Sequence, residues 1–235
     1  MLLARILFIA LLLGSALESE DVSKLLHVVR ASGEATVTAK PDRAQISFGV
    51  VTQAPTAESA AAQNAAQTTR MLEAIKHVLG SGGHIKTTGY SIAPNYQTGK
   101  NGTLRKIIGY NSNNTVLVTT DDLGLVSKIL DASAQAGAND INGISFLLRD
   151  DQVARSEALA QAAVKARESA EAIAKALNLR VSGVLQAETS DVSDVRSLYN
   201  AKAMPTVAQT IEVATPIEAG DIDVTATVIV TLAVQ

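Results

Sequence analysis

The last segment of the chain alternates between apolar and polar side chains more clearly than any other segment. A repeat of two residues is typical of a β-strand, because successive side chains of a strand point to opposite faces. The first set is entirely apolar and the second is mostly threonine: Ile222, Val224, Ala226, Val228, Val230 and Leu232, against Asp223, Thr225, Thr227, Ile229 and Thr231. We therefore expect the chain to end in a strand with one buried face, as in sheets that are covered by helices on one side.

Strand and helix patterns alternate along the rest of the chain. Strands are indicated at 28–38, 46–50, 85–96, 107–120, 144–149 and 181–187, and helices at 56–79, 122–136 and 151–177. The third helix is rich in alanine, and its inner face is predicted to mix Val153, Leu159, Ile173 and Leu177 with many alanines, which let a helix lie close to a sheet. Because most strands alternate rather than being apolar throughout, the pattern predicts an α+β fold. Its mixed, largely antiparallel sheet would carry three helices packed mainly on one face.

Residues 188–216 show no clear period and contain Pro205 and Pro216. A loop of this length is usually functional, mobile or an assembly arm. No tight internal repeat is visible, which argues against a solenoid. A single domain over 28–235, with this long loop inside it, is the expected organisation.

Residues 1–16 have the pattern of a secretory signal. Arg5 lies in a short basic region, the apolar run 6–13 follows, and Gly14, Ser15 and Ala16 offer a small-residue cleavage site. The apolar run is shorter than the roughly 20 residues that a membrane-spanning helix needs. We expect a cleaved signal, with an uncleaved anchor as the alternative. The mature chain would then be periplasmic or secreted and would hold no transmembrane segment.

Composition excludes several classes of protein. The 20 basic and 23 acidic residues give a formal charge of -3, whereas nucleic-acid-binding proteins usually carry a basic excess. Aromatic residues make up only 3% of the chain, which weakens any model built on base stacking. There is no cysteine, so disulfides, zinc–thiolate sites and cysteine nucleophiles are excluded.

The search for catalytic patterns finds none. His27, His77 and His84 do not have the spacing of paired metal ligands. The glycines at 80, 82 and 83 follow a helix, whereas a phosphate-binding loop precedes one. Ser91 lies inside an extended run, whereas a hydrolase nucleophile needs a strand–turn–helix context. The sequence therefore predicts no catalytic residue, no metal site and no cofactor, and indicates that the protein is not an enzyme.

The polar run from Tyr110 to Asn114 is unusual, because asparagine is depleted in strands and an apolar segment follows directly. The simpler interpretation is a bulge or an exposed strand start. The alternative is an interface or a ligand contact. The candidate residues for such a contact are Tyr90, Tyr96, Tyr110 and Asn111.

A set of short segments spread over residues 28–235 resembles the SIMPL-domain family, which includes exported bacterial immunogenic and oxidative-stress proteins. The matching segments, in order, are Gly33-Glu34-Ala35 before Pro41-Asp42, Gly49-Val50-Val51-Thr52, Ile92-Ala93-Pro94-Asn95-Tyr96, Ile108-Gly109-Tyr110 leading to Asn114-Thr115-Val116, Gly137-Ala138-Asn139-Asp140-Ile141 and Pro216-Ile217-Glu218-Ala219-Gly220. The chain departs from the family pattern at His84-Ile85-Lys86-Thr87 and over 188–216.

The resemblance implies an α+β domain, export, homo-oligomerisation in at least some members and an association with stress tolerance. It implies no established catalytic residue. Two hypotheses follow. The first is a non-catalytic exported protein that assembles with itself and supports the cell envelope or oxidative-stress tolerance. The alternative is a periplasmic module that binds a small molecule or peptide, or a cryptic hydrolase.

Overall fold

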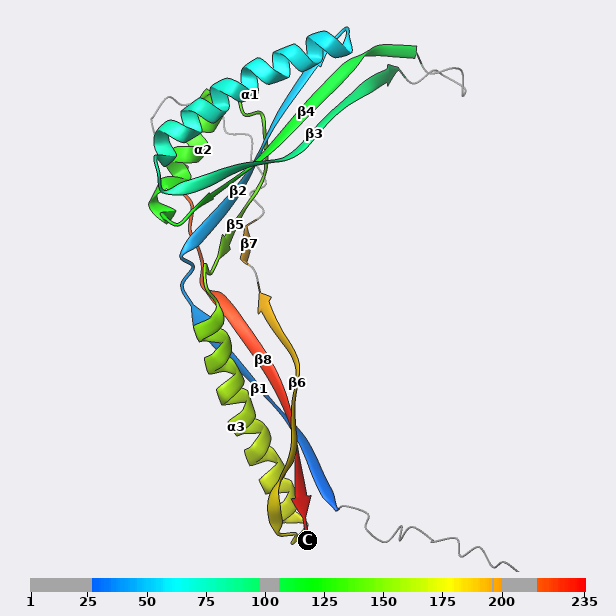
Figure 1. Cartoon of the computed structure of the whole chain (residues 1–235), viewed down its shortest axis with the longest axis vertical. Helices are drawn as coiled ribbons and strands as arrows, with labels where there is room; N and C mark the ends of the chain where they lie inside the picture. The colour runs from blue at the N-terminus through cyan, green and yellow to red at the C-terminus, as the bar shows by residue number, and fades with distance from the viewer. Residues whose placement is uncertain (1–26, 98–105, 196, 200–214) are drawn as a thin grey trace, which may run out of the picture.

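The computed structural model describes residues 27–97, 106–195, 197–199 and 215–235. Within them the chain forms two β-sheets with helices packed against them, so the predicted α+β class is confirmed (Figure 1). One mixed sheet was expected, whereas the described strands form two sheets in which every pairing is antiparallel. The predicted signal segment 1–16 lies outside the described residues.

The first sheet joins the two ends of the described chain. Its strand order is β1-β8-β6, with β1 at Val28–Ala39, β8 at Ile222–Val234 and β6 at Val181–Val195. Helix α3, Gln152–Ala176, packs mainly on β1 and β8. The six apolar residues predicted for the inner face of the last strand are all buried.

The inner face of α3 differs from the prediction. Val153, Ile173 and Leu177 are exposed, Val153 by 77%, and Leu159 is only partly buried. The alanine part of the prediction holds, since the buried residues are alanines at every fourth position: Ala154, Ala158, Ala162, Ala166, Ala170 and Ala174. Because a Cβ methyl is the smallest side chain that can fill this interface, the helix approaches the sheet much more closely than larger residues would allow.

Strand β6 is longer than predicted. It runs to Val195 and is followed by the short strand β7, Ser197–Tyr199, so the expected loop does not begin at residue 188. The register between β6 and β8 shifts at three places. Each shift inserts an extra residue in β6 and breaks the two-residue alternation. The last shift, between Thr189 and Asp191, lies in the segment where the sequence showed no clear period. The rest of the predicted loop, 200–214, lies outside the described residues.

The second sheet has the strand order β3-β4-β2-β5-β7. Helices α1 and α2 pack against each other and, together with β2 and β4, enclose a core that contains Ile46, Phe48, Met71 and Ile75. Its elements are β2 (Arg43–Ala54), α1 (Ala57–Leu79), β3 (Gly83–Gln97), β4 (Lys106–Thr120), α2 (Val126–Gln135), β5 (Asp140–Leu147) and β7. No helix of the described residues is long and apolar enough to cross a membrane.

Local signals place α1 and α2 as expected. Thr56 caps α1, because its hydroxyl accepts a hydrogen bond from the Ser59 backbone N–H at 3.2 Å. Gly80 ends the helix with φ of 58°, which glycine adopts without steric cost. The second predicted helix begins as a 3₁₀ turn at Leu123–Leu125, where the Asp122 carboxylate accepts from the Gly124 N–H at 2.9 Å.

A charged cluster lies where the chain passes between the two sheets. The Arg43 guanidinium donates to both oxygens of Asp121, with distances of 2.6 and 3.0 Å. Arg149 Nη1 lies 3.8 Å from Asp121, and the Arg149 backbone N–H donates to Asp42 at 2.6 Å. The hydrogen bond from Arg43 lowers the pKa of Asp121 and raises the pKa of Arg43 from their ordinary values.

Candidate interaction surface

Strands β3 and β4 form an arm that extends past the rest of their sheet (Figure 1). The pairing of β2 with β4 ends where Ala54 lies opposite Tyr110. Beyond Tyr110, the end of β4 that begins at Lys106 pairs only with β3. Since β3 is an edge strand, the outer end of the arm, 95–97 with 106–109, is a two-stranded ribbon with an open edge and two accessible faces.

The arm exposes large apolar side chains. Tyr90 is 56% exposed and Ile108 is 52% exposed. Ile92, Tyr96 and Ile107 are exposed as well. Tyr96, Ile107 and Ile108 lie on the two-stranded end, whereas Tyr90 and Ile92 lie opposite residues of β4 that also pair with β2. Scattered exposed apolar residues are ordinary, but several along one hairpin with an open edge are typical of a surface that binds another protein. We refer to these five residues as the arm surface.

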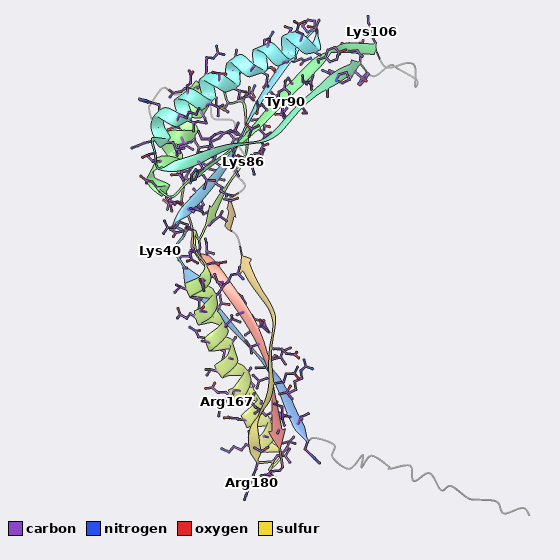
Figure 2. The ribbon with its side chains drawn as sticks, in the orientation of Figure 1. Lys40, Lys86, Tyr90, Lys106, Arg167 and Arg180 are labelled. Atoms are coloured by element: carbon purple, nitrogen blue, oxygen red, sulfur yellow. The ribbon has the colours of Figure 1, made fainter. Side chains whose placement is uncertain are left out.

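The four predicted contact residues do not form one compact site. Tyr90 lies opposite Asn114, and Tyr96 lies opposite Ile107. The two tyrosines are six residues apart along one strand, which corresponds to about 20 Å. Tyr110 is half-buried and Asn111 is exposed. Because they are consecutive in β4, their side chains lie on opposite faces of the sheet. Tyr90, Tyr96 and Tyr110 are thus spread along the arm, and Figure 2 shows Tyr90 on its strand.

The polar run of β4 lies over a buried hydrogen-bond network that the sequence did not reveal. Asn64 of α1 is fully buried, and its side-chain amide donates to the Val50 carbonyl at 2.7 Å and to the Ser112 carbonyl at 3.0 Å. Asn64 thereby joins α1 to two neighbouring strands. The signal that could have identified it is its position on the buried face of the helix, at a spacing of seven from Met71.

Three polar atoms of the same run are buried without a hydrogen-bond partner. They are Ser112 Oγ, Asn113 Oδ1 and Asn114 Oδ1. An unpaired buried polar atom is costly and is uncommon in native structures. The run pairs with β2 on one side and β3 on the other, so it is a continuous part of a central strand rather than an exposed strand start.

The histidines, Ser91 and Asp150 belong to residue types that serve in catalysis or metal binding, but they do not form a common site in the described residues. His27, His77 and His84 are exposed, and no group of three metal-ligating side chains occurs among the residues that the structure describes. Ser91 is exposed in the middle of β3 and has no helix after it. Asp150 supports the start of α3, since its carboxylate accepts from the Gln152 N–H at 2.9 Å.

Comparison with known proteins identifies relatives of the chain. It is 33% identical to the 26 kDa periplasmic immunogenic protein of Brucella melitensis over 152 residues, which are 61% of this chain and 60% of that protein. The 26 kDa periplasmic immunogenic protein of Brucella abortus is similar to the same extent. The uncharacterized protein YggE of Edwardsiella ictaluri is 26% identical over 172 residues, covering 73% of this chain and 71% of that one. The alignment with the Brucella proteins thus spans less than two thirds of their length.

A family model covers nearly all of the described structure. The SIMPL model, described as a protein of unknown function (DUF541), matches residues 29–232, from the start of β1 almost to the end of β8. The match includes both sheets and the whole arm. The chain therefore belongs to the SIMPL family.

Proposed function

We propose that this protein is an exported, non-catalytic protein that assembles with itself and supports the cell envelope or oxidative-stress tolerance. The observation that carries the proposal is the arm surface on β3 and β4. Burying apolar side chains contributes about 25 cal/mol for each Å² removed from water. Five large exposed apolar residues along the hairpin of β3 and β4 therefore favour association with another protein surface. A second copy of the chain is the partner that is present wherever the protein is made.

Export is supported by two independent features. The segment 1–16 has a basic start, a short apolar run and a small-residue cleavage site. The Brucella relatives are named as periplasmic proteins. Support for stress tolerance comes from the family resemblance, and it forms the part of the proposal that needs a test in cells.

The proposal assigns no chemistry to the polar side chains. The residue opposite Ser91 in β4 is Asn113, so this neighbour supplies no histidine that could act as a base. Nucleophilic hydrolysis needs a base within hydrogen-bond reach of the nucleophile. Structural and assembly roles account for the arm surface without any such requirement.

The experiment is light scattering on the protein purified from the periplasm of an expressing bacterium, with the intact mass recording where the signal is cleaved. We expect a discrete assembly of several chains. The variant Tyr90→Ser/Ile92→Ser/Ile108→Ser should behave as a monomer while keeping its circular dichroism spectrum. The control Val153→Ser/Val164→Ser removes exposed apolar residues from α3 and should assemble normally. A wild-type chain that stays monomeric over a wide concentration range would overturn self-assembly.

The cellular part is tested by deleting the gene and measuring survival after peroxide or detergent treatment. Wild-type protein should restore survival and the monomeric arm variant should not. Equal rescue by the two proteins would show that assembly is irrelevant to tolerance.

The three unpaired buried atoms of β4 favour a second candidate, a module that binds a small molecule or peptide. Such a ligand would supply hydrogen bonds to Ser112 Oγ and Asn114 Oδ1, close to Tyr90. Native mass spectrometry of the periplasmic protein should then reveal a bound species that the Ser112→Ala variant loses. The hydrolase version predicts an esterase or peptidase activity that Ser91→Ala abolishes. No bound species and no thermal shift with a broad panel of compounds would count against this candidate.

A further inference from the structure

We propose that the arm of one copy docks on strand β6 of the next copy, so that the chains join head to tail. This inference rests on the self-assembly proposed above and names the surface that receives the arm. Three properties support it. Like the arm, β6 has an edge position and exposed apolar residues, and its charge is opposite to that of the arm.

Strand β6 is an edge strand that the helix leaves uncovered. It lies at one side of the order β1-β8-β6, and α3 packs mainly on the other two strands. Every side chain described in β6, from Val181 to Thr189, is exposed. Val184 is 55% exposed, and Val181 and Leu185 are exposed as well. This strand thus offers a second exposed apolar surface, far along the chain from the arm.

The charges of the two surfaces are opposite. The strands of the arm, Gly83–Gln97 and Lys106–Thr120, contain Lys86 and Lys106 and no aspartate or glutamate. The sequence of β6 contains Glu188, Asp191 and Asp194 and no lysine or arginine. Opposite charges across an interface favour the correct partner, and like charges placed together disfavour a wrong one. Arm against arm would bring lysines together, and β6 against β6 would bring carboxylates together. Arm against β6 is the combination that avoids both.

The dimensions of the two strands agree with this pairing. β3 and β6 are each 15 residues long. Both are interrupted by register shifts, and Pro94 in β3 has no N–H to donate. A continuous hydrogen-bonded ladder between the two edges is therefore disfavoured, and we expect the contact to form mainly through side chains.

Different surfaces of the molecule are joined in this arrangement. In Figure 2, Lys86, Tyr90 and Lys106 mark the arm, whereas Arg180, directly before β6, lies at the opposite end of the molecule. When the arm of one copy binds β6 of a second copy, the pair still has one free arm and one free β6. The assembly then adds chains until it closes as a ring or continues as a filament.

The test is a charge exchange between Lys106 and Glu188, followed by light scattering. Lys106→Glu makes the arm repel β6 of the next copy, and Glu188→Lys has the same effect from the other side. Each variant alone should require a concentration at least about tenfold higher to assemble. In an equal mixture, each arm meets a β6 strand of opposite charge, so the mixture should assemble like the wild type.

Matched controls separate this effect from a general change in charge or folding. Lys128→Glu on α2 and Glu168→Lys on α3 make the same charge changes at exposed positions away from both surfaces, and they should assemble normally. Glu188 also pairs with Arg30 at 3.4 Å, but both side chains are well exposed and such a pair adds little stability. Recovery in the mixture requires that both variants are folded.

The outcomes separate this inference from the proposed function. A wild-type protein that assembles, with variants that assemble equally well, would overturn the arm-to-β6 contact and leave self-assembly standing. Variants that fail alone and also fail in the mixture would overturn it too, because the two residues would not face each other. A monomeric wild-type protein would overturn the proposed self-assembly and this contact together.

Discussion

The backbone of Gly33 in β1 lies directly against the backbone of Ala166 in α3. A Cβ atom placed on Gly33 would be 2.2 Å from the Ala166 nitrogen and 2.4 Å from the Ala162 carbonyl oxygen. Real Cβ atoms do not make such contacts. Glycine in the strand and alanines in the helix are therefore two parts of one requirement, namely that the helix lies on the sheet with almost nothing between them.

Gly33→Ala should destabilise the protein strongly. Because the atoms in the way belong to the backbone, the helix must move as a whole, and we expect a loss of at least about 3 kcal/mol. Gly183→Ala in β6 is the matched control, since an added Cβ there meets nothing within 4 Å. Urea unfolding followed by circular dichroism measures both. Similar stabilities of the two variants would contradict the close packing of α3.

Ala162→Leu should also be destabilising, because Ala162 is fully buried against the sheet. Insertion of a larger side chain into a closely packed interface costs about 1–3 kcal/mol. Val153→Ala should change the free energy of unfolding by less than about 0.5 kcal/mol, since Val153 is mostly exposed. The same unfolding experiment compares them. The reverse order of effects would restore the inner face that the sequence suggested.

Helix α3 and strand β8 show what the sequence could and could not predict. The helix itself and the alanines of its inner face were predicted, but four larger apolar residues were placed on that face as well, as in most helices. Gly33 was recognised as part of the family pattern, but its close packing against α3 was not predicted, because Ala166 is far away in the sequence. Strand β8 was predicted residue by residue, since only its own alternation was needed. The arm residues Tyr90 and Tyr96 were selected from the sequence, but the residues of β4 that lie opposite them depend on the register, which the sequence did not predict.

Asn64→Ala should destabilise the second sheet. The amide of Asn64 donates hydrogen bonds to the carbonyls of Val50 and Ser112 in neighbouring strands. Its removal leaves a buried gap and takes this donor away from both carbonyls. The expected loss is about 1–3 kcal/mol. Gln63→Ala is the control, because Gln63 is exposed and its side chain donates to Ser59 within the same helix. Thermal or urea unfolding of both variants decides. An Asn64→Ala variant as stable as the Gln63→Ala control would show that this amide does not stabilise the fold.

The pairing of Arg43 with Asp121 predicts a dependence of stability on acid. The hydrogen bond from Arg43 lowers the pKa of the Asp121 carboxyl in the folded protein. A carboxyl group with a lowered folded pKa stabilises the protein above its unfolded pKa of about 3.9, and this contribution is lost as the pH falls through the folded value. The wild type should therefore unfold at a higher urea concentration than Asp121→Asn at pH 7, and the difference should disappear in strong acid. Arg43→Gln should lose the same acid-dependent part, because it removes the donor. A difference between wild type and Asp121→Asn that stays constant from pH 7 to strong acid would show that the charge of this pair does not stabilise the folded protein.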